Sequence, residues 1–221
     1  MTLNEMLTDL GKRIGSTPEV ANTNMTTWIN QSYLAFCNTY DFTWLEQLSY
    51  SSTVDGQDRY SLPSDCKRVV ELKIDDKRYT YIPFEQRDLK DTSEYWFTII
   101  GDEFIINPTP TTTGLSNVEL VYIKRPEKMV EGSDSPDLLP EVYHEALVIY
   151  AFSIYNTYDE EHDEARALMG NELRPSPGTF YWYVQMAKKE EQRKKRGARR
   201  RMLGTKEYYS KDTSTTTVLG N

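Results

Sequence analysis

The sequence predicts an α+β protein with a helical core (bundle), an inserted antiparallel β subdomain and a C-terminal extended arm. Apolar residues recur at helical spacing toward both ends of the chain, whereas short alternating segments separated by turn residues fill the middle. A third observation is the strongly basic composition near the C-terminus. The predicted divisions are N-terminal core helices over 1–43, the β subdomain over 44–125, C-terminal core helices over 126–174, and a basic helix and docking arm over 175–221.

Length and composition set the class of protein. A chain of 221 residues can bury a sizeable core. Its two cysteines, Cys37 and Cys66, are too few for a disulfide framework and favour a reduced intracellular origin. The first residues are charged and lack the apolar stretch of a signal peptide, and no run approaches the roughly 20 apolar residues of a membrane span. We therefore expect a soluble protein.

Two helices are predicted at the start of the chain. Thr2 and Glu5 form a capping box, which overlaps a series of apolar residues at helical spacing, Leu3, Met6, Leu7, Leu10 and Ile14. Gly15 and Pro18 then end the first helix. A second helix is expected from about 24 to 40, with Cys37 on its apolar stripe as a small core residue.

From Trp44 onward the period changes to that of short strands. Alternating segments flank the turns at Asp55-Gly56 and Asp75-Asp76, and only Gly101-Asp102 separates YWFTII from EFIINP, which predicts a hairpin. After a Thr- and Pro-rich loop, NVELVYIKRP predicts one more strand. Six or seven strands are thus expected between 44 and 125, with a short helix near 84–89.

The helical period returns after a loop rich in Ser, Asp and Pro. Pro140 fits a first helical turn, and the next segment carries the stripe of a central core helix, Val142, Ala146, Ile149, Tyr150, Ile154 and Tyr158. Residues 159–173 extend or restart this helix, Pro175 and Pro177 break it, and a last helix begins near 179. Beyond Gly197 we expect an irregular arm.

No constellation of residues predicts an enzyme, a metal site or a cofactor site. The sequence lacks a P-loop pattern and a glycine triad after a strand, and no serine lies in a nucleophile elbow. His144 fits a structural or surface role at the start of the core helix. Residues 159–164, DEEHDE, fit a solvated acidic helix start better than a metal site, because consecutive helical residues point in different directions.

The segment from Lys188 to Lys206 is a separate electrostatic feature. It has ten basic and two acidic residues, a net charge of +8 in a chain whose total is -8, so the remainder carries -16. Such asymmetry points to a partner. The segment could be a solvated tail, a nucleic-acid-binding arm with Tyr208 and Tyr209 stacking on bases, or a docking arm for an acidic protein surface. In the third interpretation the apolar anchors are Tyr181, Trp182, Tyr183, Met202 and Leu203.

An ordered succession of motifs resembles the head-to-tail adaptor (connector) proteins of tailed bacteriophages. GKRIG ends the first helix, INQSYLAFCNTYDFTWL follows, and CKRVVELKIDDKRY is preceded by a Gly-Gln-x-x-Tyr-x-Leu-Pro step, Gly56, Gln57, Tyr60, Leu62 and Pro63. YWFTIIGDEFIINPTP leads to LVYIKRPEKM, and before the core helix stand Asp134, Pro136, Leu139, Pro140, Tyr143 and His144. The resemblance covers roughly 1–172.

The resemblance implies a structural virion protein that is not an enzyme and needs no cofactor. Such adaptors form a homo-oligomeric ring, commonly of twelve copies, beneath the portal protein. The ring connects the DNA-filled head to a tail or nozzle protein, and DNA passes through its channel without sequence-specific binding. The expected location is the virion neck, after assembly in the host cytoplasm and without a membrane. The arm would dock on the portal, as a helix or an added strand, through Tyr181, Trp182, Arg193, Arg196, Arg199, Arg200, Arg201, Met202 and Leu203.

Two other functions remain open at this point. One is a nucleic-acid-binding module that uses the basic arm, and its affinity would fall steeply with salt. The other is a virion assembly or fibre-attachment factor, which would be absent from the ring or lie elsewhere on the virion.

Overall fold

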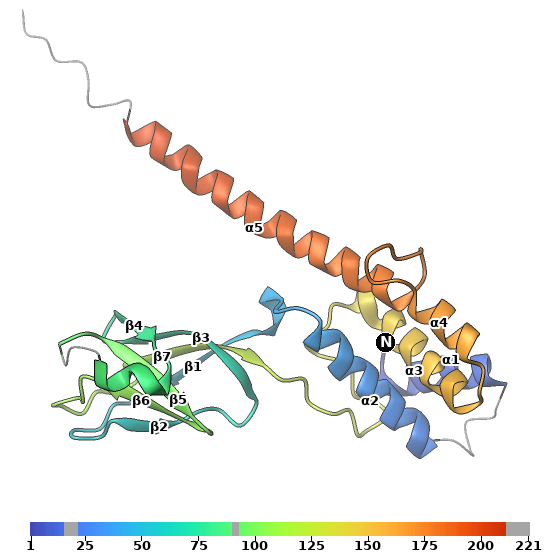
Figure 1. Ribbon diagram of the computed structural model, residues 1–221, viewed down its shortest axis with the longest axis horizontal. Helices are drawn as coiled ribbons and strands as arrows, with labels where there is room; N and C mark the ends of the chain where they lie inside the picture. Colours follow the sequence, from blue (N-terminus) through green and yellow to red (C-terminus); the bar gives the residue numbers. More distant parts are fainter. Residues whose placement is uncertain (16–21, 90–92, 211–221) are drawn as a thin grey trace, which may run out of the picture.

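The computed structural model describes residues 1–15, 22–89 and 93–210, and describes its last helix as a backbone from 196 onward. The molecule is elongated, with helices gathered at one end and a curled sheet at the other (Figure 1). The described residues form five α-helices and seven strands, so the predicted α+β class is confirmed. None of the described helices is long and apolar enough to cross a membrane.

The first helix, α1 (Leu3–Ile14), begins and ends as its sequence predicts. The Thr2 hydroxyl accepts a hydrogen bond from the Glu5 amide at 3.3 Å, and the Glu5 carboxylate accepts one from the Thr2 amide at 2.8 Å. Gly15 follows the helix with a φ of 71°, a left-handed conformation that glycine adopts without a steric cost. Pro18, also predicted to end this helix, lies outside the described residues.

The helices pack mainly on α3 (His144–Tyr158), and together they bury one continuous apolar cluster. The others are α2 (Asn22–Asn38), α4 (His162–Met169) and α5 (Phe180–Ser210). The cluster takes side chains from α1, α2, α3 and the start of α5, with Phe36, Cys37 and Tyr143 among its buried members. Cys37 is therefore the core residue that its stripe predicted. A 3-10 turn (Glu141–Tyr143) precedes α3, and α4 is a restarted helix after 159–161.

The seven strands form one sheet in the order β1-β7-β3-β4-β5-β6-β2. Their bounds are β1 (Glu46–Ser51), β2 (Arg59–Ser61), β3 (Cys66–Ile74), β4 (Lys77–Tyr81), β5 (Trp96–Ile100), β6 (Glu103–Asn107) and β7 (Val118–Lys124). Both hairpins with two-residue turns, β3–β4 and β5–β6, are confirmed. Asp75, Asp76 and Gly101 take positive φ values in these turns, as tight hairpins of this kind require.

The expected antiparallel sheet is wrong for one pair of strands. β4 and β5 pair in parallel, with Thr80 opposite Trp96 and Tyr81 opposite Phe97. Parallel neighbours need a long return connection, and the segment from 82 to 95 supplies it, including a 3-10 helix over Phe84–Leu89. The Asp55-Gly56 turn likewise joins two strands that do not pair, because β1 pairs with β7 and β2 with β6.

The expected irregular arm beyond Gly197 is wrong as far as Ser210, because α5 continues through that part. Between 192 and 203 the residues are mostly Arg, Lys, Ala, Met and Leu, which are strong helix formers. Their summed preference outweighs the cost of about 1 kcal/mol for each of Gly197 and Gly204. Residues 211–221, the remainder of the predicted arm, lie outside the described residues.

Candidate functional site

The base of α5 is part of the helical core. Phe180, Val184, Ala187 and Glu191 recur every three or four residues on one face of the helix, and all four are buried. The Phe180 ring meets Phe36 edge-on at 5.8 Å between ring centroids and contacts Tyr150 at 4.7 Å. These contacts fix the first three turns of α5 on the body.

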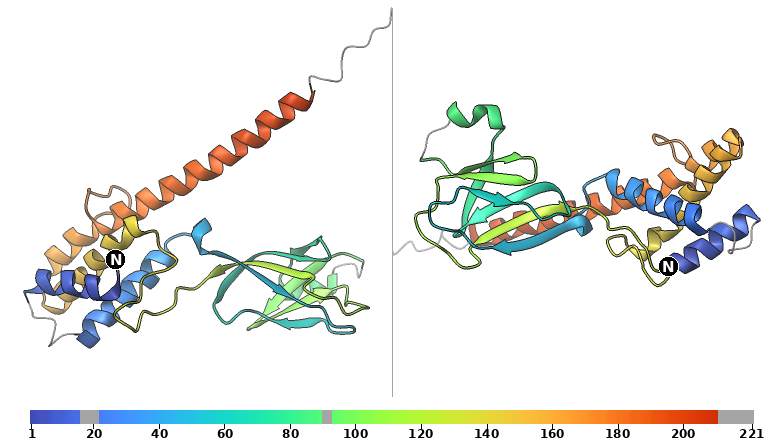
Figure 2. Two further views of the ribbon diagram at one scale, coloured as in Figure 1. Left: turned by 180° about the vertical axis from the view of Figure 1, so that it is seen from behind. Right: turned by 90° about the horizontal axis from the view of Figure 1, so that it is seen from below.

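Beyond Lys195, α5 projects away from the body. Figures 1 and 2 show the helix diverging from both the other helices and the sheet. The described side chains from 192 to 195 are exposed, and from Arg193 to Lys206 the chain has eight basic and no acidic residues. A projecting helix with charges of one sign attracts a surface of the opposite charge.

The structure separates the predicted docking residues into two groups. Tyr181 and Trp182 are half-buried in the first turn, where Tyr181 packs against the helical cluster and Trp182 contacts Tyr183 at 4.9 Å. Arg193 is exposed at the beginning of the projecting part. At 1.5 Å per residue it lies about 17 Å along the helix from Trp182.

The remaining predicted residues belong to the outer part of α5. They are Arg196, Arg199, Arg200, Arg201, Met202 and Leu203, and their side chains lie outside the described part of the chain. The helical period places positions 196, 199, 200 and 203 on one face. Basic positions and one apolar position therefore share that face.

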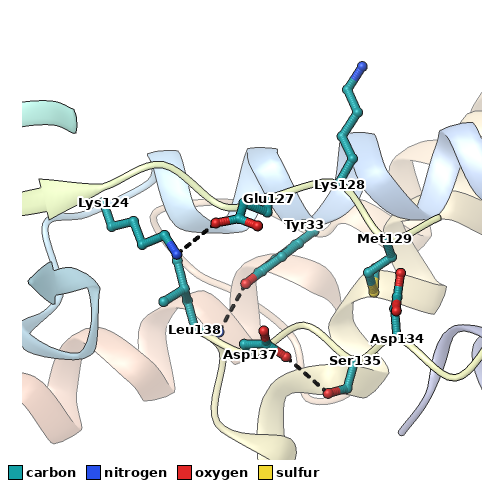
Figure 3. Close-up of a pocket in the computed structure, with 9 residues that line it drawn as sticks. All are labelled: Tyr33, Lys124, Glu127, Lys128, Met129, Asp134, Ser135, Asp137 and Leu138. Atoms are coloured by element: carbon teal, nitrogen blue, oxygen red, sulfur yellow. Dashed lines mark hydrogen bonds and ion pairs between the residues drawn. The ribbon is translucent and has the colours of Figure 1, made fainter. Parts of the chain in front are cut away.

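A small pocket of about 180 Å³ marks the junction between helices and sheet (Figure 3). Tyr33 points into it from α2, and its hydroxyl accepts a hydrogen bond from the Leu138 amide at 3.0 Å. Two charged groups of the pocket pair with each other, since Lys124 Nζ lies 2.8 Å from the Glu127 carboxylate. The Asp134 carboxylate accepts bonds from the amides of Val130 and Glu131, which holds its pKa below the usual range. These interactions hold the loops that connect the helices to the sheet. We therefore interpret the pocket as a structural feature of the junction.

The histidines and cysteines take structural or exposed positions. His144 is buried, with Nε2 at 2.8 Å from the Leu139 carbonyl oxygen, and burial lowers its pKa. His162 is exposed at the start of α4. Burial raises the pKa of Cys37 to about 12, which leaves its thiol protonated and unreactive. In the described part of the chain, no group of three His, Cys, Asp or Glu side chains could hold a metal ion.

The model of the SU10 adaptor protein family matches residues 1–201. The chain belongs to the SU10 adaptor protein family. The matched residues include the helical core, the whole sheet and most of α5. The match therefore extends beyond the part covered by the motif resemblance. The family is one of phage structural adaptors, which makes this protein a virion component that interacts with other virion proteins. An adaptor family is a structural class and not an enzyme class. The comparison with curated proteins finds no match.

Sequence reasoning missed the residues that hold α5 to the body. Glu190 and Glu191 were counted only as two acidic residues in a basic segment. Their spacing to Lys194 and Lys195 is four residues, which is the signal of paired charges along a helix. The spacing of Phe180, Val184 and Ala187, three or four residues apart, is a second signal, because it indicates a buried helical face.

Proposed function

We propose that this protein is the head-to-tail adaptor of a tailed bacteriophage. Twelve copies form a ring beneath the portal in the virion neck, after assembly in the host cytoplasm. The ring joins the DNA-filled head to a tail or nozzle protein. The observation that carries this proposal is the projecting α5, anchored at its base and strongly basic along its outer part.

In this proposal the outer part of α5 docks on the portal. Its charge attracts an acidic surface and speeds encounter, but exposed ion pairs contribute only about 0–1 kcal/mol each. Lasting attachment therefore depends on the apolar residues Met202 and Leu203, together with the number of arms in the ring. Arg193, Arg196 and Arg199–Arg201 supply the attraction. Tyr181 and Trp182 contribute at the base, where Tyr181 mainly holds the helix on the core.

The rest of the chain forms the ring itself. Each copy presents two different faces to its neighbours, as a closed ring with heterologous interfaces requires. The helical end is the platform, residues 44–125 form an inserted subdomain, and the sheet faces the tail or nozzle protein. Outside 188–206 the chain carries a net charge of -16, which suits a channel wall that DNA passes without binding.

Truncation after Lys195 tests the docking role of α5. A cut after Arg174 would also remove Phe180, Val184 and Ala187 from the core, so it would confuse folding with docking. Removing 196–221 leaves those contacts in place. We expect unchanged core helices by circular dichroism and loss of attachment to portal-bearing heads. If the shortened protein attaches as well as the full chain, α5 is not the docking element.

Charge removal gives a finer test with a matched control. Replacing Arg199, Arg200 and Arg201 by Ala should weaken attachment and reduce its dependence on salt. The control replaces three exposed basic residues of the body, Lys128, Arg166 and Arg174, and should leave attachment unchanged. Equal weakening by both triple variants would show that total charge matters and the position in α5 does not.

The basic outer part of α5 also favours a second candidate, nucleic-acid binding. Binding to DNA phosphates releases counterions and loses affinity steeply as salt rises, whereas docking with apolar anchors loses less. Titration with a DNA duplex at two salt concentrations separates the two functions. Cryo-EM of the intact virion neck tests the ring, and density for this protein at a fibre base would favour a fibre-attachment factor instead.

A further inference from the structure

The point where α5 leaves the body is built around a buried carboxylate. Glu191 has 0% of its surface exposed, although the side chains from 192 to 195 are exposed. Charged side chains are almost never fully buried unless they are paired, because a carboxylate loses its hydration. Among the described side chains of α5, the last buried one is therefore a carboxylate.

The partners of Glu191 come from α5 and from the connection between α2 and the sheet. Its Oε2 accepts a hydrogen bond from the Thr43 hydroxyl at 3.0 Å. Its Oε1 lies 3.4 Å from Lys195 Nζ, an ion pair without hydrogen-bond alignment. The Lys195 ammonium also lies 5.4 Å from the centre of the Tyr40 ring. One turn of α5 is thus fastened to Tyr40 and Thr43.

Glu190 makes a parallel set of contacts. It accepts a hydrogen bond from the Tyr143 hydroxyl at 2.7 Å and pairs with Lys194 at 2.9 Å. The Lys194 ammonium lies 5.9 Å from the centre of the Trp44 ring. Trp44 is itself stacked on Phe42 at 4.1 Å between ring centroids. The contacts of Glu190 and Lys194 therefore hold the same connection between α2 and β1 as the contacts of Glu191 and Lys195 do.

This connection leads directly into the sheet. Tyr40 to Trp44 follow α2, and β1 begins at Glu46, only two residues after Trp44. An apolar residue at position 191 would hold α5 on the core at least as strongly as a buried ion pair does. Hydrogen bonds with fixed directions define an orientation, which apolar packing alone leaves less specified.

We propose that Glu190 and Glu191 form a clasp with Tyr40, Thr43, Trp44 and Tyr143 that sets the direction of α5 relative to the body and the sheet. Glu191 is the positioning residue of α5, because it is the last buried side chain among those that the structure describes in this helix. A rod pivoting at that point would sweep its outer end through a wide arc. Fixing the pivot keeps every arm of an assembly aimed alike. The docking consequence rests on the proposed function, whereas the orientation of α5 does not.

Distance measurements between spin labels test the clasp in the full-length chain. Labels are placed at Thr80→Cys on β4 and Thr205→Cys on α5. Cys37 is buried, and the half-buried Cys66 is replaced by alanine, so that the label attaches to the introduced cysteines. We expect one narrow distance distribution for the labelled parent protein.

Three variants then separate the clasp from general stability. Glu191→Met keeps the length of the side chain and removes both carboxylate oxygens, and Thr43→Val keeps the shape and removes the hydroxyl. Both should broaden the distribution while the far-ultraviolet circular dichroism stays unchanged. Thr43→Ser retains a hydroxyl and should restore the narrow distribution. Lys189→Gln, on the exposed side of α5, is the matched control and should behave as the parent does.

The outcomes distinguish this inference from the docking proposal. Narrow distributions in Glu191→Met and Thr43→Val would overturn the clasp. A broadened distribution supports it, and attachment to portal-bearing heads should then weaken on the order of tenfold if about a tenth of the arms point correctly. Broadening with unchanged attachment would keep the positioning role and count against α5 as the docking element.

Discussion

The helical end and the sheet end of this molecule are stabilised in different ways. The helical cluster is aromatic and continuous, with Phe36 in contact with the rings of Phe42, Tyr143 and Phe180 at 5.8 to 6.2 Å. The sheet has a smaller separate cluster on one face, in which Tyr60 stacks on Phe104 at 5.5 Å. Helices pack mainly with helices and strands with strands.

The junction between the two ends is mostly polar. Arg68 on β3 pairs with Asp41 after α2 at 2.7 Å, and Lys67 lies 3.7 Å from the same carboxylate. Few apolar residues cross the junction, and Ile123 at the end of β7 is one that joins the helical cluster. Each end should therefore unfold largely by itself, because cooperative units follow buried apolar contacts. The following predictions test that separation.

The largest effect is expected from Phe36→Ala. This ring is fully buried among three other aromatic rings, so its removal should cost about 3–5 kcal/mol of unfolding free energy. Hydrogen exchange followed by mass spectrometry should show faster exchange in α2 and α3 and unchanged exchange in β3 and β7. Equal acceleration in all four elements would show that the two ends form one cooperative unit.

A somewhat smaller loss of stability, this time at the sheet end, is expected from Leu72→Ala. Leu72 is fully buried on β3, and its truncation should cost about 2–3 kcal/mol, because an open curled sheet can relax around the cavity. Exchange should accelerate in β3, β4 and β7 while α2 and α3 keep their protection. Attachment to portal-bearing heads should persist. Faster exchange in α3 would contradict the proposed division at 44–125.

The comparison also shows which features were accessible from sequence. Local signals succeeded: the Thr2–Glu5 cap, the stop at Gly15 and the Gly101-Asp102 hairpin each depend on neighbouring residues. The parallel pairing of β4 with β5 depends on how a long connection returns to the sheet, which residue alternation does not specify. The seven strands were therefore predictable and their order was not.

In the candidate site, too, local features could be predicted from the sequence and long-range contacts could not. The basic composition of 188–206 was evident, and so was Arg193 as one of its charges. Gly197 suggested a helix end, but the helix-forming residues around it carry α5 to Ser210. The contacts of Glu191 with Thr43 join residues 148 positions apart, and no local pattern could reveal them.

A smaller effect, again confined to the helical end, should appear with pH. Burial lowers the pKa of His144, so the unfolded chain, with a pKa of about 6.5, binds the proton more readily. Stability is therefore greatest above that value and falls as pH drops below it. The sheet has no histidine, since the chain's two are His144 and His162.

Urea unfolding of the helices at pH 7.5 and pH 6.0 measures this dependence. The His144→Gln variant should lose part of it, because glutamine cannot gain the proton. A parent protein whose helical transition is insensitive to pH over this range would show that His144 titrates alike in both states.

The smallest effect on stability, and the most direct test of the junction, is expected from Asp41→Asn. The carboxylate and its partner Arg68 are both well exposed, so the ion pair contributes about 0–1 kcal/mol and the melting temperature should hardly change. Asp41 nevertheless ties the end of α2 to the start of β3. Its loss should broaden the distance distribution between labels at Thr80→Cys on β4 and Arg166→Cys on α4.

The matched control for Asp41→Asn is Glu71→Gln. Glu71 pairs with Arg78 at 3.1 Å and with Lys73 at 3.7 Å, so it makes the same kind of contacts but entirely within the sheet. Removing its charge should leave the distance distribution narrow. If both variants give equally narrow distance distributions, the ion pairs are not needed. The two chain segments that connect the ends, 45–46 and 124–129, then hold the ends in place by themselves. A difference between the variants would instead assign the orientation of the sheet to a single exposed carboxylate.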